Sequence, residues 1–335
     1  MRCLSLLKAS LLAFVTLSAL PLAGCGASNL PGMGPDFELP SFTVARGWAS
    51  APAATLSEPR SSSLLARKAG GFALAFDTRK LGGKDVFVTL SADGERWSAP
   101  VAVGQTRRTE EEPALWEDAE GKLRLIYASN ESGTFQLYAA VSTDGKTWDE
   151  PVAVTNTLDH AKSPSVTGTP EGVAVAYRDL GGACQVMSSS DGAVWGLSRQ
   201  IDASGGDPAI VHDGEGLRVV YHRAEKLFER VERQGTWSEA VQVPGDGARR
   251  EPALAKIGGK LSLVYSTATS GGAWKLAAME SGPAGWGQEQ DLVVGPDDHG
   301  FPSLAEGQDG GSLLAWGISR LTEERAIFVA RSGGR

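Results

Sequence analysis

The stretch Ser142 to Trp148, STDGKTW, occurs in two further versions, SADGERW at 91–97 and SSDGAVW at 189–195. A catalytic motif is normally written once, whereas a phrase that recurs marks a repeated structural unit. Alignment on the tryptophans extends the repeat to six units, which are led by Trp48, Trp97, Trp148, Trp195, Trp237 and Trp286. Their spacing of 42 to 51 residues is the length of a four-stranded propeller blade.

Each unit has the same internal order. A short run with proline at its second position comes first, as in EPALW (112–116), SPSVT (163–167), DPAIV (207–211), EPALA (251–255) and FPSLA (301–305). Two alternating runs follow, such as KLRLIYAS and FQLYAAVS, and the tryptophan-led run closes the unit. Alternation with period two and glycine-rich punctuation predicts strands, so we expect an all-β chain. A pair of β-sandwiches is the alternative architecture.

The two ends of the chain complement each other. The last run, AIFVARS, is of the third type, and no fourth follows it. The run FTVARGWASAPAATL, which begins at Phe42, is of the fourth type and has no first three. Joined, they make one whole blade, an arrangement that removes exposed sheet edges. The prediction is a six-bladed β-propeller over residues 42–335, closed by an N-terminal strand that completes the last blade.

The N-terminal residues have the pattern of an export signal. Arg2 and Lys8 precede an apolar run, Leu11 to Leu20, that is too short for a comfortable membrane span. The stretch LAGC at 22–25 resembles the lipobox of bacterial lipoproteins, in which the signal is cut before the cysteine. The resemblance implies a signal peptide over 1–24, a lipidated Cys25, and anchoring at the outer membrane or cell surface. The alternative is an ordinary secretory signal with an incidental cysteine. Residues 25–41 are rich in Gly, Pro and Ser, as in a flexible tether.

Charge and cysteine content exclude several classes of function. Loss of the leader removes Arg2 and Lys8 and takes the net charge from −8 to −10, which argues against a nucleic-acid partner. Once Cys3 is removed and Cys25 lipidated, Cys184 is the single remaining thiol. It lies in a strand-like run and is expected to be a small buried hydrophobe. No zinc, phosphate-loop, dinucleotide or Ser–His–Asp motif is visible, so we predict neither a cofactor nor a metal.

The repeated phrase resembles the Asp box of sialidases and related propellers, in a form one residue shorter. At a hairpin turn, glycine takes positive φ, Ser and Asp accept backbone N–H groups, and tryptophan packs between blades. The resemblance places these boxes on the outer rim, away from an active site. A ring of metal-binding or catalytic carboxylates is the functional alternative. The predicted structural residues are Ser91, Asp93, Gly94, Trp97, Ser142, Asp144, Gly145, Trp148, Ser189, Asp191, Gly192 and Trp195.

Candidate ligand-binding residues lie in the loops that enter each first strand and that join second to third strands. The first unit is similar to the opening blade of a sialidase, in which Arg60 and Arg79, the latter in Asp77-Thr78-Arg79, occupy the arginine positions. The resemblance implies a clamp for a substrate carboxylate, with Asp85 near the acid/base position. Further candidates by resemblance or loop position are Asp207, Arg223, Arg250 and Glu251. An ordinary solvated rim is the structural alternative, because loops are usually polar.

The resemblance fails at the nucleophile. Sialidases use a tyrosine at the start of the last blade, where this chain has Phe301, and all five of its tyrosines precede that unit. Phenylalanine has no hydroxyl with which to attack an anomeric carbon. Two functions therefore compete: a propeller that binds a glycan or a protein with little catalysis, and an active exo-α-sialidase or related glycoside hydrolase.

Overall fold

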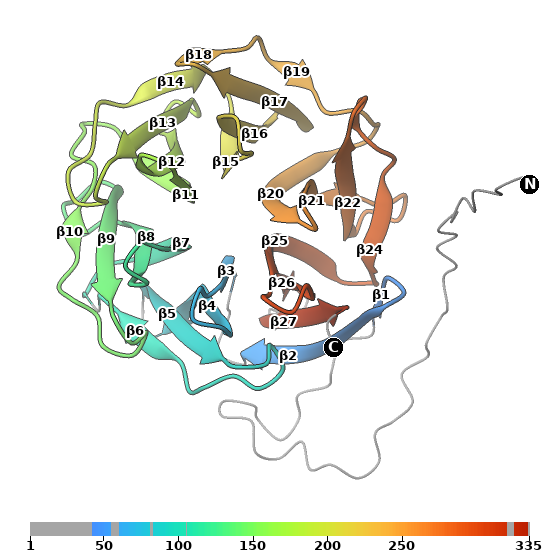
Figure 1. Cartoon of the computed structure of the whole chain (residues 1–335), viewed down its shortest axis with the longest axis horizontal. Helices are drawn as coiled ribbons and strands as arrows, with labels where there is room; N and C mark the ends of the chain where they lie inside the picture. The colour runs from blue at the N-terminus through green and yellow to red at the C-terminus, as the bar shows by residue number, and fades with distance from the viewer. Residues whose placement is uncertain (1–41, 55–59, 81–82, 105, 320–324, 334–335) are drawn as a thin grey trace, which may run out of the picture.

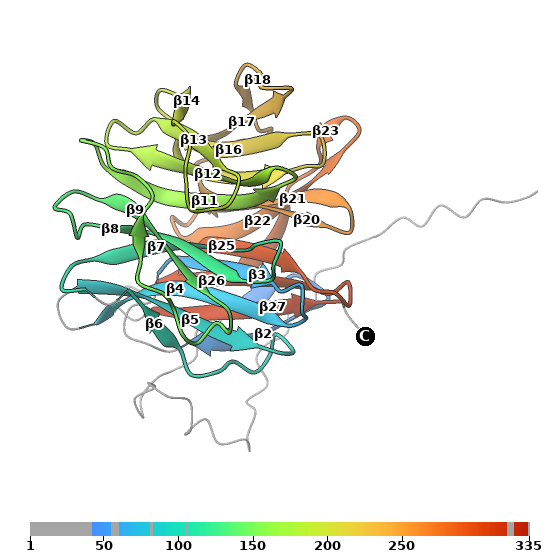
Figure 2. The same ribbon diagram turned by 60° about the vertical axis from the view of Figure 1, so that its left-hand side comes forward.

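The computed structural model describes residues 42–54, 60–80, 83–104, 106–319 and 325–333. The predicted signal peptide, Cys25 and the tether over 25–41 lie outside the described residues. Within those residues all regular structure is β, arranged as a six-bladed propeller around a central axis, as Figures 1 and 2 show. The predicted architecture is confirmed, and the β-sandwich alternative is wrong. The described residues contain no helix able to cross a bilayer.

The strands of the first three blades follow one another from the axis outward. Blade 1 comprises β3 (Ser62–Ala66), β4 (Phe72–Lys80), β5 (Gly83–Ser91) and β6 (Val101–Val103). Blade 2 comprises β7 (Glu110–Glu117), β8 (Leu123–Ser129), β9 (Gln136–Ser142) and β10 (Val152–Ala153). Blade 3 comprises β11 (Ala161–Thr169), β12 (Gly172–Asp179), β13 (Cys184–Ser189) and β14 (Arg199–Asp202).

Blades 4 and 5 carry additional outer strands, and blade 6 takes its outer strand from the N-terminal segment. Blade 4 comprises β15 (Gly206–His212), β16 (Leu217–Arg223), β17 (Lys226–Arg233), β18 (Thr236–Trp237) and β19 (Val241–Gln242). Blade 5 comprises β20 (Arg249–Ile257), β21 (Lys260–Ala268), β22 (Trp274–Gly282), β23 (Gly285–Trp286), β24 (Gln290–Val294) and β1 (Thr43–Val44). Blade 6 comprises β25 (Asp298–Glu306), β26 (Ser312–Ser319), β27 (Arg325–Ser332) and β2 (Trp48–Ala54).

The N-terminal segment closes the ring in two steps. Strand β2 pairs antiparallel with β27, from Trp48 opposite Ser332 onward, so the predicted closure of the last blade is confirmed. The short strand β1 was not expected. It pairs with β24, with Thr43 opposite Val294, and so adds a fifth consecutive strand to the sheet of blade 5. One segment thereby fastens blades 5 and 6 together (Figure 1).

The core is divided into six apolar clusters, each between two adjacent blades. One of the six aligned tryptophans packs against each cluster, always on the interface with the preceding blade. Trp148 of blade 2, for example, packs with Leu123 and Leu125 against Val86 and Val88 of blade 1. The repeated tryptophan therefore cements blade to blade. Cys184 is fully buried in such a cluster, and burial raises the pKa of its thiol to about 12.

The Asp-box turns lie on the face of the propeller where third strands end. In the second box, Ser142 Oγ accepts the Gly145 N–H at 2.8 Å, and Asp144 Oδ1 accepts the N–H groups of Lys146 and Thr147 at 2.7 and 2.8 Å. These backbone bonds lower the pKa of Asp144 to about 2. The first and third boxes repeat the pattern.

Gly94, Gly145 and Gly192 take φ between 72° and 77°. A Cβ on Gly94 would approach Leu313 of blade 6 to 2.6 Å, so glycine is required there for blade packing as well as for the turn.

Candidate functional site at the axis and between blades 5, 6 and 1

Five of the six innermost strands share a bulge at the proline of the repeat. The residue before each proline has positive φ, between 46° and 57°, and the pairing with the second strand is interrupted there. Proline donates no ladder hydrogen bond, and a bulge redirects the neighbouring side chain. Non-glycine residues with positive φ tend to gather at functional sites, and here five stand in equivalent places. They are Glu112, Ser163, Asp207, Glu251 and Phe301.

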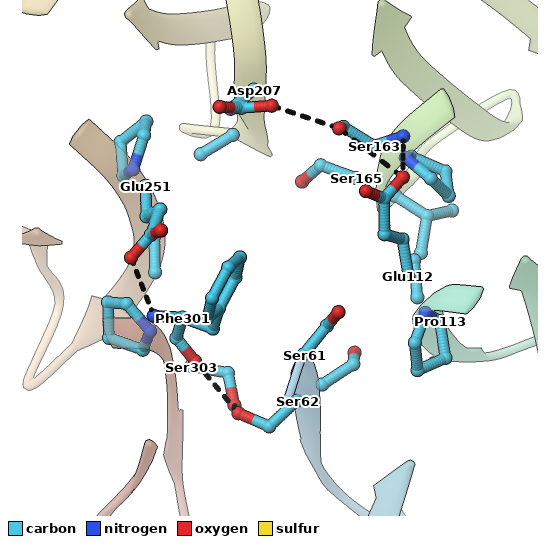
Figure 3. Close-up of a pocket in the computed structure, with 18 of the residues that line it drawn as sticks. Ser61, Ser62, Glu112, Pro113, Ser163, Ser165, Asp207, Glu251, Phe301 and Ser303 are labelled. Carbon is cyan, nitrogen blue, oxygen red and sulfur yellow. Dashed lines mark hydrogen bonds between the residues drawn. The ribbon is translucent and has the colours of Figure 1, made fainter. Parts of the chain in front are cut away.

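These five residues line a central cavity of about 210 Å³ around the propeller axis. Figure 3 shows their side chains around the opening, together with the serines of blade 1. Blade 1 has no bulge: β3 pairs with β4 in unbroken register from Ser62 opposite Phe76. Ser62 Oγ instead donates to the Phe301 carbonyl oxygen at 2.9 Å and so ties blade 1 to blade 6.

Carboxylates in and beside the central cavity accept hydrogen bonds from the neighbouring blade. Asp77 Oδ2 accepts the Glu112 N–H at 2.9 Å, and Glu112 Oε2 accepts the Ser163 N–H at 2.7 Å. Glu251 Oε2 accepts the Phe301 N–H at 2.9 Å in the same manner. Burial raises the pKa of Glu112 and of Glu251 above the ordinary glutamate value, and the charge of Asp207 adds to both shifts.

Lysine side chains of blades 1 and 3 form ion pairs with a glutamate of blade 2. Glu111 binds both Lys84 of blade 1 and Lys162 of blade 3. Burial alone would raise the pKa of Glu111, but the hydrogen bonds and charges of the two lysines lower it below its usual range. The Lys162 ammonium also lies 4.3 Å from the centre of the Phe135 ring. This part of the face is a closed ion-pair network.

A lateral cavity of about 190 Å³ opens between blades 5, 6 and 1. Arg60, Arg250, Glu251 and Phe301 line it, together with His299 and Ser319. The Arg60 guanidinium is 4.9 Å from the Phe301 ring centre and is exposed, while that of Arg250 lies 3.8 Å over Trp274. Arg250 Nε is 3.4 Å from Glu251 Oε1 but makes no hydrogen bond with it. Two guanidinium groups, each beside an aromatic ring, thus line one cavity.

The wall of the lateral cavity contains a neutral histidine. His299 is fully buried, and its Nδ1 accepts the Trp316 Nε1–H at 3.2 Å. Burial lowers the pKa of His299 to about 4, so the ring is uncharged at neutral pH. The Phe42 ring, from the N-terminal segment, packs edge-on against it with centroids 5.7 Å apart. Positive charge at this cavity therefore comes from the arginines alone.

Asp77, Asp85 and Arg223 line neither of these two cavities. Asp77 is fully buried, accepts the Ser61 hydroxyl at 2.7 Å within blade 1, and links this blade to blade 2 through the Glu112 N–H. Arg79 lies in β4 opposite Lys84, and its side chain is outside the described structure. Asp85 lies in β5 opposite Thr78. Arg223 donates to Asp202 Oδ2 at 2.8 Å and stacks on Phe228 at 3.8 Å.

Asp207 belongs to the central cavity. Its Oδ1 accepts the Ser163 hydroxyl at 2.9 Å and lies 3.6 Å from Arg178 Nε. Of the predicted ligand-binding residues, the structure therefore brings Arg60, Arg250 and Glu251 together in the lateral cavity, and Glu251 and Asp207 together at the axis. Within the described residues, no three His, Cys, Asp or Glu side chains come together as a metal site.

Sequence reasoning missed a buried carboxyl group beside this face. Glu110 is fully buried at the start of β7, where Thr106 donates to one carboxylate oxygen and the other, Oε2, has no hydrogen-bond partner. Burial, and secondarily the negative charge of Asp85, raises the pKa of Glu110 to about 7. Sequence reasoning also missed Glu112 and Ser163 as cavity residues, although the repeated proline after each was a visible signal. Phe301 was singled out only as the residue at the nucleophile position.

The comparisons with solved structures agree on the fold. An unknown-function protein from Dyadobacter fermentans superposes with a TM-score of 0.71 at 13% identity, over 87% of this chain and 100% of that one. The NanB sialidase from Streptococcus pneumoniae gives a TM-score of 0.64 at 11% identity, over 82% of this chain and 68% of that one. Trypanosoma rangeli sialidase in complex with sialic acid gives 0.60 at 14% identity, over 88% and 59%. The fold is sialidase-like.

This likeness concerns architecture alone, because identities of 11 to 14% carry no shared activity. The chain spans about three fifths of the length of the Trypanosoma rangeli enzyme. No protein-family model matches the sequence, and no curated protein does.

Proposed function

We propose that this sialidase-like propeller is a bacterial lipoprotein, anchored through Cys25, that binds an acidic glycan in the lateral cavity without hydrolysing it. The observation that carries the proposal is the meeting of Arg60 and Arg250 in one cavity with Phe301 between the blades. Guanidinium groups suit carboxylates, and aromatic faces suit the apolar side of a sugar ring. Sialic acid is bound by the Trypanosoma rangeli neighbour and is the first ligand to test.

The absence of turnover follows from the chemistry of Phe301. The first strand of blade 6 carries this residue, and sialidases by resemblance place the tyrosine nucleophile at that point. A Trypanosoma rangeli sialidase forms a covalent intermediate with 2,3-difluorosialic acid. A benzyl side chain cannot form that bond. Loss of a nucleophile removes most of a rate while the remaining groups still bind.

The test combines turnover and binding on the same purified protein. A fluorogenic sialoside measures hydrolysis, and calorimetry measures binding of free sialic acid and other acidic sugars. We expect binding that falls at least tenfold in both Arg60→Ala and Arg250→Ala, without turnover above the uncatalysed rate. Arg107→Ala removes the same charge from an exposed loop on the same face and serves as the control.

Two results would contradict the proposal. Hydrolysis that depends on Arg60 would show an active glycoside hydrolase, the competing function. Equal binding by the wild type and both arginine variants would show that the lateral cavity is not the ligand site.

A further inference from the structure

The N-terminal segment reaches the propeller on the face that carries the lateral cavity. Thr43 pairs with Val294, the last residue of β24, and four residues later Asp298 lines that cavity. The preceding residue, Phe42, packs against His299 of the same cavity. Because β1 runs antiparallel to β24, the described chain begins, at Phe42, at the edge of this cavity face beside blades 5 and 6.

Two loops of the same face that adjoin blade 3 each carry an exposed leucine. The strands of blade 3, β11 to β14, lie across the ring from β1 in Figure 1. Leu158, in the loop between β10 and β11, is 100% exposed, and Leu180, in the turn between β12 and β13, is 62% exposed. The two loops are neighbours because Ala161 pairs with Asp179. These two apolar side chains offer a point of contact, and the position of Phe42 selects this face over the opposite one, near which Val194 and Leu197 are equally exposed.

The loop that carries Leu158 is held firmly from below. The buried amide of Gln136 donates to the carbonyl oxygens of Thr157 and Asp159 at 3.1 and 3.0 Å and accepts the Thr157 N–H at 3.1 Å. The turn that carries Leu180 is fastened by Asp179 Oδ1, which accepts the Ala183 N–H at 2.9 Å. Both leucines are therefore displayed by rigid turns, at little further cost in conformational entropy on contact.

We propose that the cavity face lies against the membrane that carries the Cys25 anchor, and that Leu158 and Leu180 enter the interfacial layer of that membrane. This inference rests on the proposed lipid anchor. A flexible tether of the length between Cys25 and Phe42 has a root-mean-square extension of roughly 20–25 Å. The anchor and the leucines then hold opposite sides of one face. Tethering makes the weak leucine contact intramolecular.

Charge on this face is compatible with a lipid surface. Arg107 and Arg108 are exposed in the equivalent loop one blade away, between β6 and β7, and anionic headgroups attract such side chains. Exposed acidic residues in loops and at strand ends of the same face limit this attraction, namely Glu131, Asp159, Glu225, Asp246 and Asp298. In this orientation the lateral cavity faces ligands that the same membrane presents.

The experiment uses the full lipidated protein in vesicles of phosphatidylethanolamine and phosphatidylglycerol that contain a headgroup quencher. A fluorophore is attached at Asn156→Cys on the cavity face or at Lys146→Cys on the Asp-box face, both exposed positions. Cys184 is buried and does not compete for the label. We expect several-fold stronger quenching at position 156 than at position 146.

A matched pair of double variants tests the leucines. Leu158→Asp with Leu180→Asp should reduce quenching at position 156 to the level at position 146. Val194→Asp with Leu197→Asp places the same charges at exposed sites of the same blade near the opposite face and should leave quenching unchanged. Equal quenching at the two labels, or no effect of the leucine variants, would overturn the proposed orientation.

Vesicle flotation separates this inference from the proposals it rests on. Wild-type protein that floats, and a Cys25→Ser variant that does not, establish the anchor independently of orientation. Protein that fails to float would overturn both the anchor and the membrane contact. Strong quenching at position 156 without acidic-sugar binding would leave the orientation standing and remove the proposed ligand.

Discussion

The carboxylates of the Asp boxes and those of the central cavity have pKa values that are shifted in opposite directions. On the Asp-box face, backbone N–H groups lower the pKa of Asp93, Asp144 and Asp191, so each charge stabilises its own turn. On the cavity face, burial raises the pKa of Glu112 and Glu251, so each charge is held at a cost. Residues that cost stability and persist are typical of functional sites. The comparison separates turns in which the carboxylates stabilise the fold from a cavity in which burial opposes their charge.

The largest expected effect concerns two tryptophans, one for each side of this comparison. Trp148 packs between blades 1 and 2, and Trp148→Ala should cost about 3 kcal/mol of unfolding free energy. Trp274 supports the Arg250 guanidinium at 3.8 Å, and Trp274→Ala should weaken acidic-sugar binding more than it destabilises the fold. Thermal melts and calorimetry on both variants measure the two effects. A Trp148→Ala protein with an unchanged melting temperature would contradict the assigned role.

The next effect is a pH dependence from Glu110. Its folded-state pKa is about 7 and its ordinary value is 4.5, so the folded state binds the proton more tightly than the unfolded state. Its carboxyl group therefore favours folding below about pH 4.5, and that contribution is lost as pH rises through 7. The shift corresponds to up to about 3 kcal/mol.

Glu110→Gln removes this titration. The variant should therefore lose less stability than the wild type between pH 5 and pH 8. Urea unfolding at the two pH values measures the difference. Glu120→Gln, at an exposed position, is the control and should behave as the wild type. A Glu110→Gln variant that kept the wild-type pH dependence would show that another group carries it.

A smaller effect is expected from the hydroxyl groups of the Asp boxes. Ser142 is buried and accepts the Gly145 N–H, so Ser142→Ala should cost about 1 kcal/mol. Acidic-sugar binding should not change, because the turn lies on the opposite face. If Ser142→Ala lost acidic-sugar binding at an unchanged melting temperature, the Asp boxes would have a functional role and the contrast between the two sets of carboxylates would be wrong.

The sequence predicted the propeller and its closure because those features repeat. Six tryptophan-led runs, five prolines and complementary chain ends are patterns that one sequence can display. Strand β1 escaped prediction because Thr43 and Val44 form only two pairs and look like the start of a longer run. The bulges also escaped, since the direction of the residue before each proline depends on strand register.

Three consecutive glutamates show most clearly what a sequence cannot reveal. Glu110 is buried beside Thr106, Glu111 binds Lys84 and Lys162, and Glu112 lines the central cavity. The pKa of the first is raised, that of the second lowered and that of the third raised. Identical neighbours differ because successive residues of a strand point in different directions, the bulge redirects Glu112, and the partners in blades 1 and 3 are distant in the chain.

The smallest effect is expected at Phe301, the residue at the position of the sialidase nucleophile. Phe301→Tyr adds the missing hydroxyl, and we expect a change in stability of no more than about 0.5 kcal/mol, because the half-buried ring borders the lateral cavity. We also expect no hydrolysis of a fluorogenic sialoside. A tyrosine nucleophile needs an acid on the leaving group, and Asp85, the residue suggested for that role, does not line the cavity. Turnover by Phe301→Tyr that is abolished in Phe301→Tyr with Asp85→Ala would show a site one side chain away from catalysis.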